Sequence, residues 1–311
     1  MKKNIRRYPL NQSQLYKCHS RRRLARMLDT DLKTLEEIAK NPRYYSFTRP
    51  KKNSNERRII DAPNQRLKKI QTSVYAYLRK VKRPDWVMAG EVGKNWTENA
   101  ETHADDSYFV KADISKFFDN CEREYVYQFF LTKLEQSPDV ADICTSLVMF
   151  EGKIVQGAPT SMVIAFYAYQ KMFEELACVA KQFHCIFTIY VDDVTYSSLD
   201  PIDSAALEAR ISQIMAAYGH KVKRQKVRTY GSQRAKRVTG VILSTDHQML
   251  TPNSLRQEIY ADFQQYLAQK KADKDDPNLD HQRASLLGKI NSARQINPGI
   301  FPEMHRILKN G

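Results

Sequence analysis

The sequence predicts an α+β protein with a central sheet of the split-βαβ type. Segments rich in β-branched and aromatic residues alternate with segments in which apolar residues recur every three or four positions. The alternation is clearest in the centre of the chain, where strand candidates at 107–115, 185–198 and 236–244 are separated by helix candidates. Strands that alternate with helices in this way form a sheet covered by helices.

Length and composition set the frame for this fold. At roughly 100–200 residues per domain, the 311 residues allow about two compact units, and 17 Tyr and 13 Phe supply core material that disordered chains lack. The five Cys include no C-x-x-C pair, which argues against a disulfide framework and a structural zinc site. The basic amino terminus is followed by polar residues rather than an apolar stretch, so we expect a cytoplasmic protein without a signal peptide or membrane span.

The amino-terminal third predicts helices around one hairpin. Apolar spacing over 24–40 predicts two short helices, with capping residues at 29–31 between them. Residues 44–62 read as two strands around a polar turn at 53–55, ended by Pro63. The segment 65–81 carries apolar residues at steps of three and four and is expected to be an amphipathic helix.

The remaining elements follow from the same periodicities. Helices are expected at 122–136, 161–183, 201–219, 253–270 and about 279–295, with Ser204 as a cap and with Thr160 or Ser161 capping the long helix. A basic strand or turn is expected between the helix that ends at 219 and the strand at 236–244.

Charge is the first indication of function. Fifty Lys and Arg against 35 Asp and Glu give a net charge of +15, which favours a polyanionic partner, nucleic acid above all, over simple solubility charge. The charge is concentrated in the basic blocks 1–33, 51–69 and 219–240, whereas 98–142 carry eleven acids against four bases. Either cations mediate contact with the partner at this acidic segment, or the segment faces away from it.

The sharpest local feature is the pair Asp192 and Asp193 between two apolar, β-forming runs. An exposed Asp-Asp turn is the ordinary explanation for such a pair. Asp113, at the end of the strand candidate YFVKAD, adds a third acid at a strand end. Because unpaired buried carboxylates are costly, carboxylates on adjacent strand ends suit two Mg²⁺ ions about 3.5–4 Å apart, the arrangement used in phosphoryl transfer.

An ordered set of motifs resembles the palm of bacterial reverse transcriptases. The set comprises ADISKFF at 112–118, QGAPTS at 156–161, YVDD at 190–193 and a basic G-x-x-x-x-x-x-K segment at 219–226. The segments NAETH at 99–103 and VTG at 238–240 are similar to the N-A-x-x-H and V-T-G signatures of retron reverse transcriptases. The resemblance covers roughly residues 30–245.

The resemblance implies a right-hand polymerase and a division of labour among its residues. It implies an amino-terminal helical segment at 1–43, fingers and palm at 44–245 and a helical thumb at 246–311. Asp113, Asp192 and Asp193 would form the catalytic metal site, with the backbone of Ile114, for two Mg²⁺ ions or Mn²⁺. The residues implied at the deoxynucleoside triphosphate are Phe118 as a gate against ribose, Gln156, Gly157, Lys226 and Arg58, with Arg57, Lys51 and Lys52 as weaker candidates.

The two signatures imply a contact with RNA. The residues that they mark, together with neighbouring bases, are Asn99, His103, Arg234, Lys236, Arg237, Val238, Thr239 and Gly240. Helix-surface polar groups are the ordinary alternative for Asn99 and His103. Three positions depart from the family pattern: Met162 stands where Pro is common, Val191 where retron enzymes often have Ala, and Phe166 where Asn is familiar.

As a retron-type enzyme, the chain is expected to copy part of a cognate structured noncoding RNA into 2′-5′ branched, RNA-linked, multicopy single-stranded DNA. The resemblance also implies an antiphage role with an effector protein encoded nearby, and removal of template RNA by a host RNase H, since we expect no RNase H or endonuclease domain. Two alternatives stay open. The chain could be another group II intron-like bacterial reverse transcriptase, or an RNA-binding scaffold that holds an effector and polymerises little.

Overall fold

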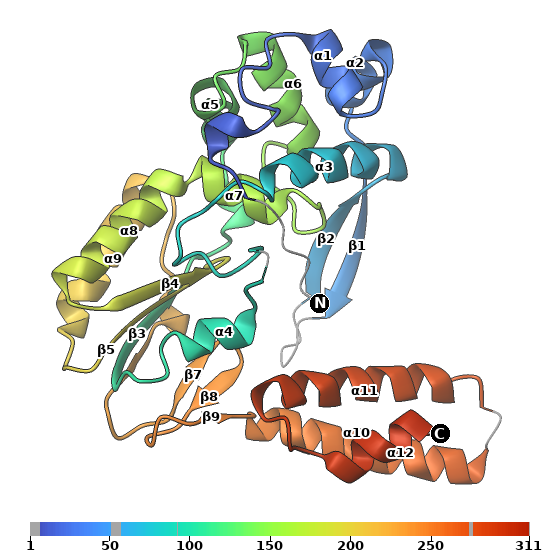
Figure 1. Cartoon of the computed structure of the whole chain (residues 1–311), viewed down its shortest axis with the longest axis vertical. Helices are drawn as coiled ribbons and strands as arrows, with labels where there is room; N and C mark the ends of the chain where they lie inside the picture. Colours follow the sequence, from blue (N-terminus) through green and yellow to red (C-terminus); the bar gives the residue numbers. More distant parts are fainter. Residues whose placement is uncertain (1–6, 51–56, 92, 274–275, 311) are drawn as a thin grey trace.

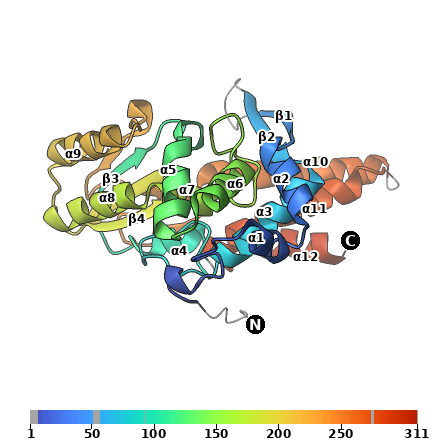
Figure 2. The same cartoon turned by 90° about the horizontal axis from the view of Figure 1, so that it is seen from above.

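The computed structural model describes residues 7–50, 57–91, 93–273 and 276–310, and it confirms the α+β class (Figure 1). Helices at the amino-terminal end lead into a two-stranded hairpin, then a four-stranded sheet with its helices, a three-stranded sheet and a group of carboxyl-terminal helices. Viewed from above, the carboxyl-terminal helices lie beneath the rest of the molecule (Figure 2).

The predicted amino-terminal helix pair is present. After a 3₁₀ turn at Leu10–Gln12, α1 spans Arg21–Met27 and α2 spans Leu32–Lys40. Each helix begins at a side-chain cap: the Ser20 hydroxyl accepts from the backbone N–H of Arg23, and the Asp31 carboxylate accepts from that of Thr34. These caps satisfy N–H groups that have no partner within the helix.

The basic hairpin is also present. Strands β1 (Tyr44–Pro50) and β2 (Arg57–Pro63) pair antiparallel and lead into helix α3 (Gln65–Leu78). The predicted turn at 53–55 lies outside the described residues. Helix α3 starts where Asn64 accepts from the Leu67 N–H, and it buries its apolar stripe in the main core.

The four-stranded sheet has the predicted split-βαβ arrangement. Its order is β4-β5-β3-β6, for strands Ile186–Tyr190, Asp193–Ser198, Tyr108–Asp113 and Arg228–Tyr230, and all neighbouring pairs are antiparallel. The chain leaves β3, passes through helices to β4, and returns as β5 between them. The end of β3 therefore lies directly beside the β4–β5 turn.

The helices of this region are α5 (Arg123–Gln128), α6 (Pro138–Val148), α7 (Ser161–Ala168), α8 (Gln170–Gln182) and α9 (Ser204–Ala217). Helix α5 continues into a π-helical turn at Phe129–Lys133, where one helix over 122–136 was predicted. The single helix predicted over 161–183 is wrong, because Tyr169 leaves helical geometry between α7 and α8. Its hydroxyl accepts from the Glu122 N–H and donates to the Asn120 carbonyl, which holds the break in place.

Two further expectations need correction. Asp203, not Ser204, caps α9 by accepting from the Ala206 N–H. The strand predicted at 236–244 is a tight hairpin of β7 (Lys236–Val238) and β8 (Val241–Leu243), because residues 239 and 240 have positive φ. The elements that sequence periodicity did not predict are α4 (Trp96–Glu101), α6, β9 (Met249–Leu250) and α12 (Pro302–Asn310).

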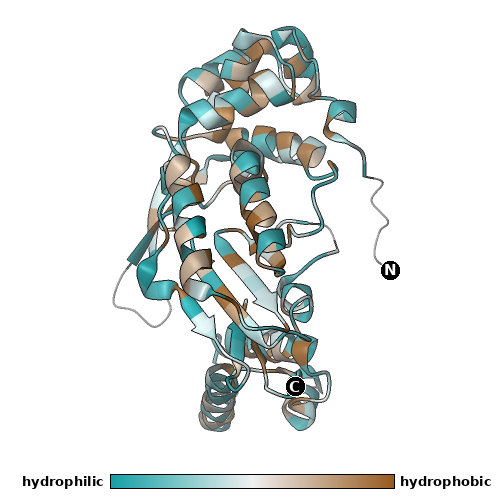
Figure 3. Cartoon of the chain, turned by 90° about the vertical axis from the view of Figure 1, so that its left-hand side faces the viewer, coloured by the Kyte–Doolittle hydropathy of each residue, from teal (hydrophilic) through white to brown (hydrophobic). Residues whose placement is uncertain are grey.

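The two faces of the four-stranded sheet differ in chemistry. Val110, Ala112, Val194 and Tyr196 alternate onto one face and are at most 2% exposed, in the core shared with α8 and α9. From that side the covering helices display mixed hydrophilic and hydrophobic residues, as amphipathic helices do (Figure 3). The other face is largely polar and carries the acids described below.

The carboxyl-terminal helices have a core of their own. Helices α10 (Asn253–Ala272) and α11 (Leu279–Ile296) pack with α12 around a hydrophobic cluster that includes Ile259, Leu286 and Ile290. This cluster is distinct from the main core and from a smaller one around β7 and β8. Within the described residues, no helix is both long and apolar enough to cross a membrane.

Candidate active site

Three acids converge at one end of the four-stranded sheet. Asp113 is the last residue of β3 and lies opposite Asp193, the first residue of β5, in the antiparallel register. Asp192 occupies the two-residue turn between β4 and β5, and its carbonyl accepts from the Ile114 N–H at 2.8 Å. The sequence prediction that these acids meet at adjacent strand ends thus agrees with the backbone register.

The turn itself is strained. Val191 has φ of 63°, in the left-handed region that β-branched residues avoid. Backbone strain of this kind costs on the order of 1–3 kcal/mol and is concentrated at functional sites. Asp192 is therefore presented directly after a residue whose backbone conformation is unfavourable for its side chain.

Lysines balance the carboxylates. Lys226 Nζ lies 2.5 Å from Asp113 Oδ2, and Lys111 Nζ lies 3.1 Å from Asp193 Oδ2. Burial, and then the charge of Asp113, raise the pKa of Asp192 to about 6. Burial also raises the pKa of Asp193, which the charge of Lys111 opposes. The cluster thus carries negative charge that is costly to hold there without cations.

The donor chemistry fits a hard divalent cation, because carboxylate and carbonyl oxygens are the ligands that Mg²⁺ and Mn²⁺ prefer. In the described parts of the chain, however, no group of three or more Asp, Glu, His or Cys side chains is arranged to hold a metal ion. The ammonium groups of Lys226 and Lys111 stand beside Asp113 and Asp193 and mark where positive charge is needed.

The basic segment before β6 brings Lys226 to this site. Residues 221–223 run alongside the end of β3, where the Lys223 N–H donates to the Asp113 carbonyl and the Ser115 N–H to the Lys221 carbonyl, both at 2.8 Å. A 3₁₀ turn at Arg224–Lys226 follows. The structure therefore brings together a predicted nucleotide-binding lysine and a predicted metal ligand from opposite ends of the motif set.

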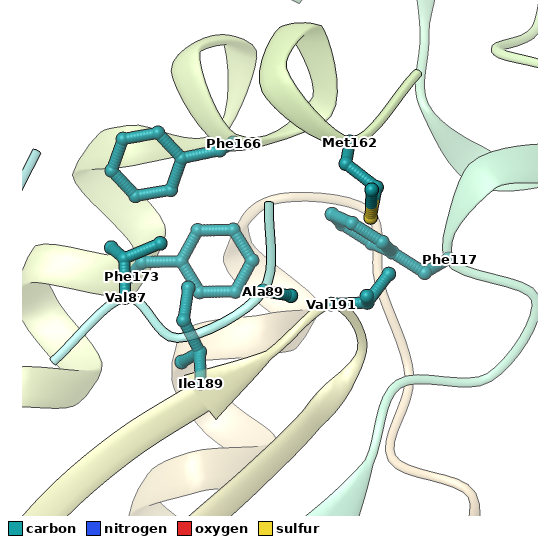
Figure 4. Close-up of a pocket in the computed structure, with 8 residues that line it drawn as sticks. All are labelled: Val87, Ala89, Phe117, Met162, Phe166, Phe173, Ile189 and Val191. Atoms are coloured by element: carbon teal, nitrogen blue, oxygen red, sulfur yellow. The ribbon is translucent and has the colours of Figure 1, made fainter. Parts of the chain in front are cut away.

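Aromatic residues lie behind the acids. Phe118 begins a 3₁₀ turn at Phe118–Asn120 and is half-buried, with its ring centroid 5.5 Å from that of buried Phe117. Phe117, Met162 and Val191 approach one another around a cavity of about 20 Å³ that α7 and the 87–89 segment complete (Figure 4). Its apolar lining and size suit a dry packing gap beneath the hairpin tip rather than a substrate pocket.

The QGAPTS loop contacts strand β2 of the β1–β2 hairpin. A Cβ placed on Gly157 would lie 2.4 Å from the Asp61 carbonyl oxygen of β2, so only glycine permits this approach. Gln156 beside it is exposed. The predicted caps of the following helix are wrong: Thr160 at the cap position makes no side-chain cap bond, and the Ser161 hydroxyl donates to the Val155 carbonyl at 2.5 Å.

Phe166 and Met162, two of the departures from the family pattern, lie beside the small cavity. Phe166 is 4% exposed and packs against Trp86 and Phe173, with the Arg83 guanidinium 5.8 Å from its ring centroid. Met162 reaches toward Phe117 (Figure 4). Phe166 thus belongs to the apolar layer under the β4–β5 hairpin, whereas Met162 is 42% exposed and borders that layer at the cavity.

The other predicted residues lie apart from the acids. Arg58 is exposed on β2, opposite Arg49, in a separate sheet. Lys51 and Lys52 lie outside the described residues. Arg234 and Arg237 are exposed around β7.

Part of the signature set is buried. Asn99, His103, Val238 and Lys236 are at most 1% exposed, so their side chains offer no surface to RNA in this structure. Thr239 and Gly240 are partly exposed in the β7–β8 turn, with φ of 44° and 94°. Whether the signatures support RNA binding indirectly stays a prediction.

Sequence reasoning missed two features of the site. Lys111 is two residues before Asp113 and therefore on the same strand face, a relation that the period of two could have revealed. The 86–88 segment has no strand-like pattern, yet it extends the sheet: the Ile189 N–H donates to the Trp86 carbonyl at 2.9 Å, and the Met88 N–H to the Ile189 carbonyl at 3.0 Å.

Comparison with known proteins identifies the family. The pattern that defines the family "Reverse transcriptase (RNA-dependent DNA polymerase)" matches residues 49–243. This chain belongs to the reverse transcriptase family. The match contains strand β2, the β4–β5 hairpin, the three acids, the Gly157 loop and Lys226.

Curated relatives narrow the resemblance to retrons. The chain is 26% identical over 220 residues to the retron Mx65 reverse transcriptase of Myxococcus xanthus, covering 65% of this chain and 51% of the relative. It is 28% identical over 179 residues to the Se72 enzyme of Salmonella heidelberg (56% and 47%), and 24% identical over 206 residues to the Ec86 enzyme of Escherichia coli (66% and 64%). It spans about half the length of the first two relatives.

Two telomerases are among the solved structures that align with part of this chain. The truncated apo telomerase of Candida tropicalis has a TM-score of 0.48 at 12% identity, covering 67% of this chain and 55% of that one. The telomerase of Candida albicans, in complex with a fragment of telomeric RNA, has a TM-score of 0.48 at 11% identity, covering 83% and 55%.

Proposed function

We propose that this reverse transcriptase is an RNA-directed DNA polymerase of the retron type, which copies part of a structured RNA into single-stranded DNA. The observation that carries the proposal is the register that sets Asp113 opposite Asp193, with Asp192 in the strained turn beside them. Strain and costly negative charge at one point are expected where cations and substrate meet.

Asp113, Asp192, Asp193 and the Ile114 carbonyl are the donors that we assign to two divalent cations, Mg²⁺ or Mn²⁺. Bound there, such ions lower the pKa of an attacking hydroxyl and neutralise charge on the phosphates. Lys226 is exposed enough to leave Asp113 and contact the triphosphate, since its side chain is 52% exposed. Lys111 is only 13% exposed and would keep Asp193 oriented.

We assign the remaining contacts to the incoming nucleotide. Phe118 follows Asp113 by five residues and would lie beneath the sugar, where its ring would exclude a ribose 2′-OH. Gln156 and the Gly157 backbone would line the nucleotide and template, and Arg58 on the hairpin would hold the triphosphate. Support comes from exposure of Gln156 and Arg58 and from the close contact that Gly157 makes with β2.

The layout that we propose is that of a right hand. Residues 44–245 would form the fingers and palm, after a helical segment at 1–43. Residues 246–311 would form the thumb, consistent with the separate core of α10, α11 and α12. The basic blocks at 1–33, 51–69 and 219–240 would bind the RNA backbone, so RNA affinity should fall steeply as salt rises.

The biological role that we propose follows the retron relatives. The RNA would supply a 2′-OH primer and the product would be branched, RNA-linked multicopy DNA. A host RNase H would remove copied template, and an effector protein would complete an antiphage system in the cytoplasm. The similarity to curated retron enzymes supports this assignment.

Nucleic acid extracted from the purified protein tests the proposal. The expected result is single-stranded DNA that stays joined to RNA under denaturing conditions and migrates as free DNA after RNase treatment. RNA alone, from protein that also fails to extend a primer, would replace the polymerase with an RNA-binding scaffold. Unbranched complementary DNA would indicate another kind of bacterial reverse transcriptase.

A further inference from the structure

On the polar face of the four-stranded sheet, different polar side chains lie at the two ends of the strands. Along the paired strands, Asp113 and Asp193 form one row, Lys111 and Thr195 the next, and Phe109 and Ser197 the third. All point to the same face, because strand residues alternate with a period of two. The acids stand at one end of this face, and the segment that follows α4 covers the other.

His103 joins the two strands that carry the catalytic turn. Its side chain is completely buried, with Nδ1 2.6 Å from Ser197 Oγ on β5 and Nε2 2.7 Å from Thr188 Oγ1 on β4. Thr188 lies four residues before Asp192, and Ser197 lies four residues after Asp193. At about 3.3 Å per residue, both contacts fall within roughly 15 Å of the acids.

The hydrogen bonds around His103 fix its tautomer. Burial, and then the charge of Lys111, lower the pKa of His103 to about 3, so the ring is neutral and has one donor and one acceptor. The Ser197 hydroxyl donates to Asp106 Oδ2 and therefore accepts from His103 Nδ1–H. Nε2 is then the acceptor, and Thr188 donates to it. Every hydrogen-bonding position of the ring is used.

Helix α4, which directly precedes the His103 segment, is hydrogen-bonded to the β7–β8 hairpin. Asn99 Nδ2 donates to Thr239 Oγ1 at 3.3 Å, and the Thr239 hydroxyl donates to the Trp96 carbonyl at 2.7 Å. Ala100 and Val238, both completely buried, pack beside them in the small hydrophobic cluster. Signature residues about 140 positions apart in the sequence therefore meet at one internal interface.

We propose that His103 is a positioning residue for the polymerase reaction: it fixes β4 against β5, and so sets the turn that carries Asp192 and Asp193. Asn99 and Thr239 anchor the same segment to the β7–β8 hairpin, from which the chain continues into α10. We call this arrangement the clasp, consisting of Asn99, His103, Asp106, Thr188, Ser197 and Thr239. The inference rests on the proposed function but assigns the signatures to catalytic geometry rather than to reading RNA.

The test compares His103→Ala, His103→Gln and His103→Asn with the wild type in single-nucleotide incorporation on a generic RNA template with a DNA primer. A misplacement near 1 Å reduces rate by about 100-fold, so we expect kcat of the Ala variant to fall about 10- to 100-fold. The KM for the nucleotide and the Kd for the structured RNA should each stay within about twofold. His281→Ala, an exposed histidine on α11, is the matched control.

The two amide variants serve as the conservative rescue. Asn places an amide near the Nδ1 position and can donate to Ser197, whereas Gln can accept from Thr188 near the Nε2 position. Each should restore part of the kcat that Ala loses. Asn99→Ala should have a smaller effect, since Asn99 Oδ1 has no hydrogen-bond partner among the described residues and only its donor is used.

Hydrogen exchange supplies a readout that does not depend on activity. In His103→Ala, or in the Asn variant if Ala fails to fold, residues 186–198 should exchange at least about tenfold faster while α10 and α11 stay unchanged. Unchanged exchange in that hairpin, or weaker RNA binding with unchanged kcat, would overturn the proposal. Wild-type protein that makes no DNA would refute the proposed function alone, and the exchange result would still decide the clasp.

Discussion

The two ends of one sheet face show what distinguishes a reactive polar cluster from a structural one. At the acid end the three carboxylates are partly exposed, burial raises the pKa of Asp192 and of Asp193, and two lysines offset only part of the negative charge. The turn that carries Asp192 is strained at Val191. At the clasp end, His103 is buried and both ring nitrogens have partners. Carboxylates with incompletely balanced charge thus distinguish the proposed catalytic end of the sheet. Fully hydrogen-bonded buried groups distinguish the end that holds the strands in place.

This difference predicts opposite responses to mutation. Acid-end changes should reduce activity while leaving the fold intact, whereas clasp changes should loosen the β4–β5 hairpin as well.

Among substitutions outside the three acids, Lys226→Ala should produce the largest loss of activity. Removal of one group that stabilises transferring charge costs about 100- to 1,000-fold in kcat, and the exposed Lys226 side chain contributes little to stability. Steady-state incorporation kinetics, together with a melting curve, would check this. Lys226→Arg, which keeps the charge, should recover part of the rate; a large drop in melting temperature would assign Lys226 to the framework instead.

Gly157→Ala should come next. The added methyl would meet the Asp61 carbonyl oxygen at 2.4 Å, so β2 and the loop must separate. Overpacking of this kind costs about 1–3 kcal/mol, and activity should fall roughly 10- to 100-fold through a raised KM for the nucleotide. Gly152→Ala on the preceding turn is a control, since nothing lies within 4 Å of its added Cβ, although its positive φ adds local strain. Equal losses of activity in Gly157→Ala and Gly152→Ala would show that the contact between Gly157 and β2 has no special role.

Phe118→Ala tests the sugar gate. Loss of the ring should raise the relative use of ribonucleotides about tenfold while incorporation of deoxynucleotides falls less. Competition between matched ribo- and deoxynucleoside triphosphates measures the ratio. The control is Phe117→Leu in the adjacent buried residue, which should reduce stability without altering the ratio. If only Phe117→Leu increased the use of ribonucleotides, Phe117 rather than Phe118 would be the sugar gate.

Asp192→Asn should cause only a small change in the free energy of unfolding, and that change should be stabilising. The folded pKa of Asp192 is about 6, above the ordinary value of 3.8, so the charged form destabilises the folded state. Above pH 6 the variant should be more stable than the wild type by about 1 kcal/mol, after allowance for partial exposure. The difference should shrink between pH 6 and 4. Urea unfolding at pH 4 and 8 would show it, and a destabilised variant at pH 8 would contradict it.

Much of the fold and the acid site could be predicted from the sequence, because strand alternation and strand-end acids are local patterns. The β4–β5 hairpin, the split-βαβ sheet and the position of Asp113 beside the acid pair follow from such patterns. The break at Tyr169 and the turn at 239–240 could not, since a tyrosine hydroxyl bonded to a distant backbone and a positive φ at Thr239 depend on tertiary contacts. The clasp was missed for the same reason: its partners are far apart in sequence.

The central claim is that Asp192, in the strained turn, and Asp193, at the start of β5, catalyse DNA synthesis from an RNA template. The most direct measurement is extension of a DNA primer on an RNA template with deoxynucleotides and Mg²⁺, by the wild type and by Asp192→Asn with Asp193→Asn. We predict robust extension by the wild type and at least about a 1,000-fold loss in the double variant, with no decrease in its melting temperature. Undiminished synthesis by the folded double variant would contradict the claim.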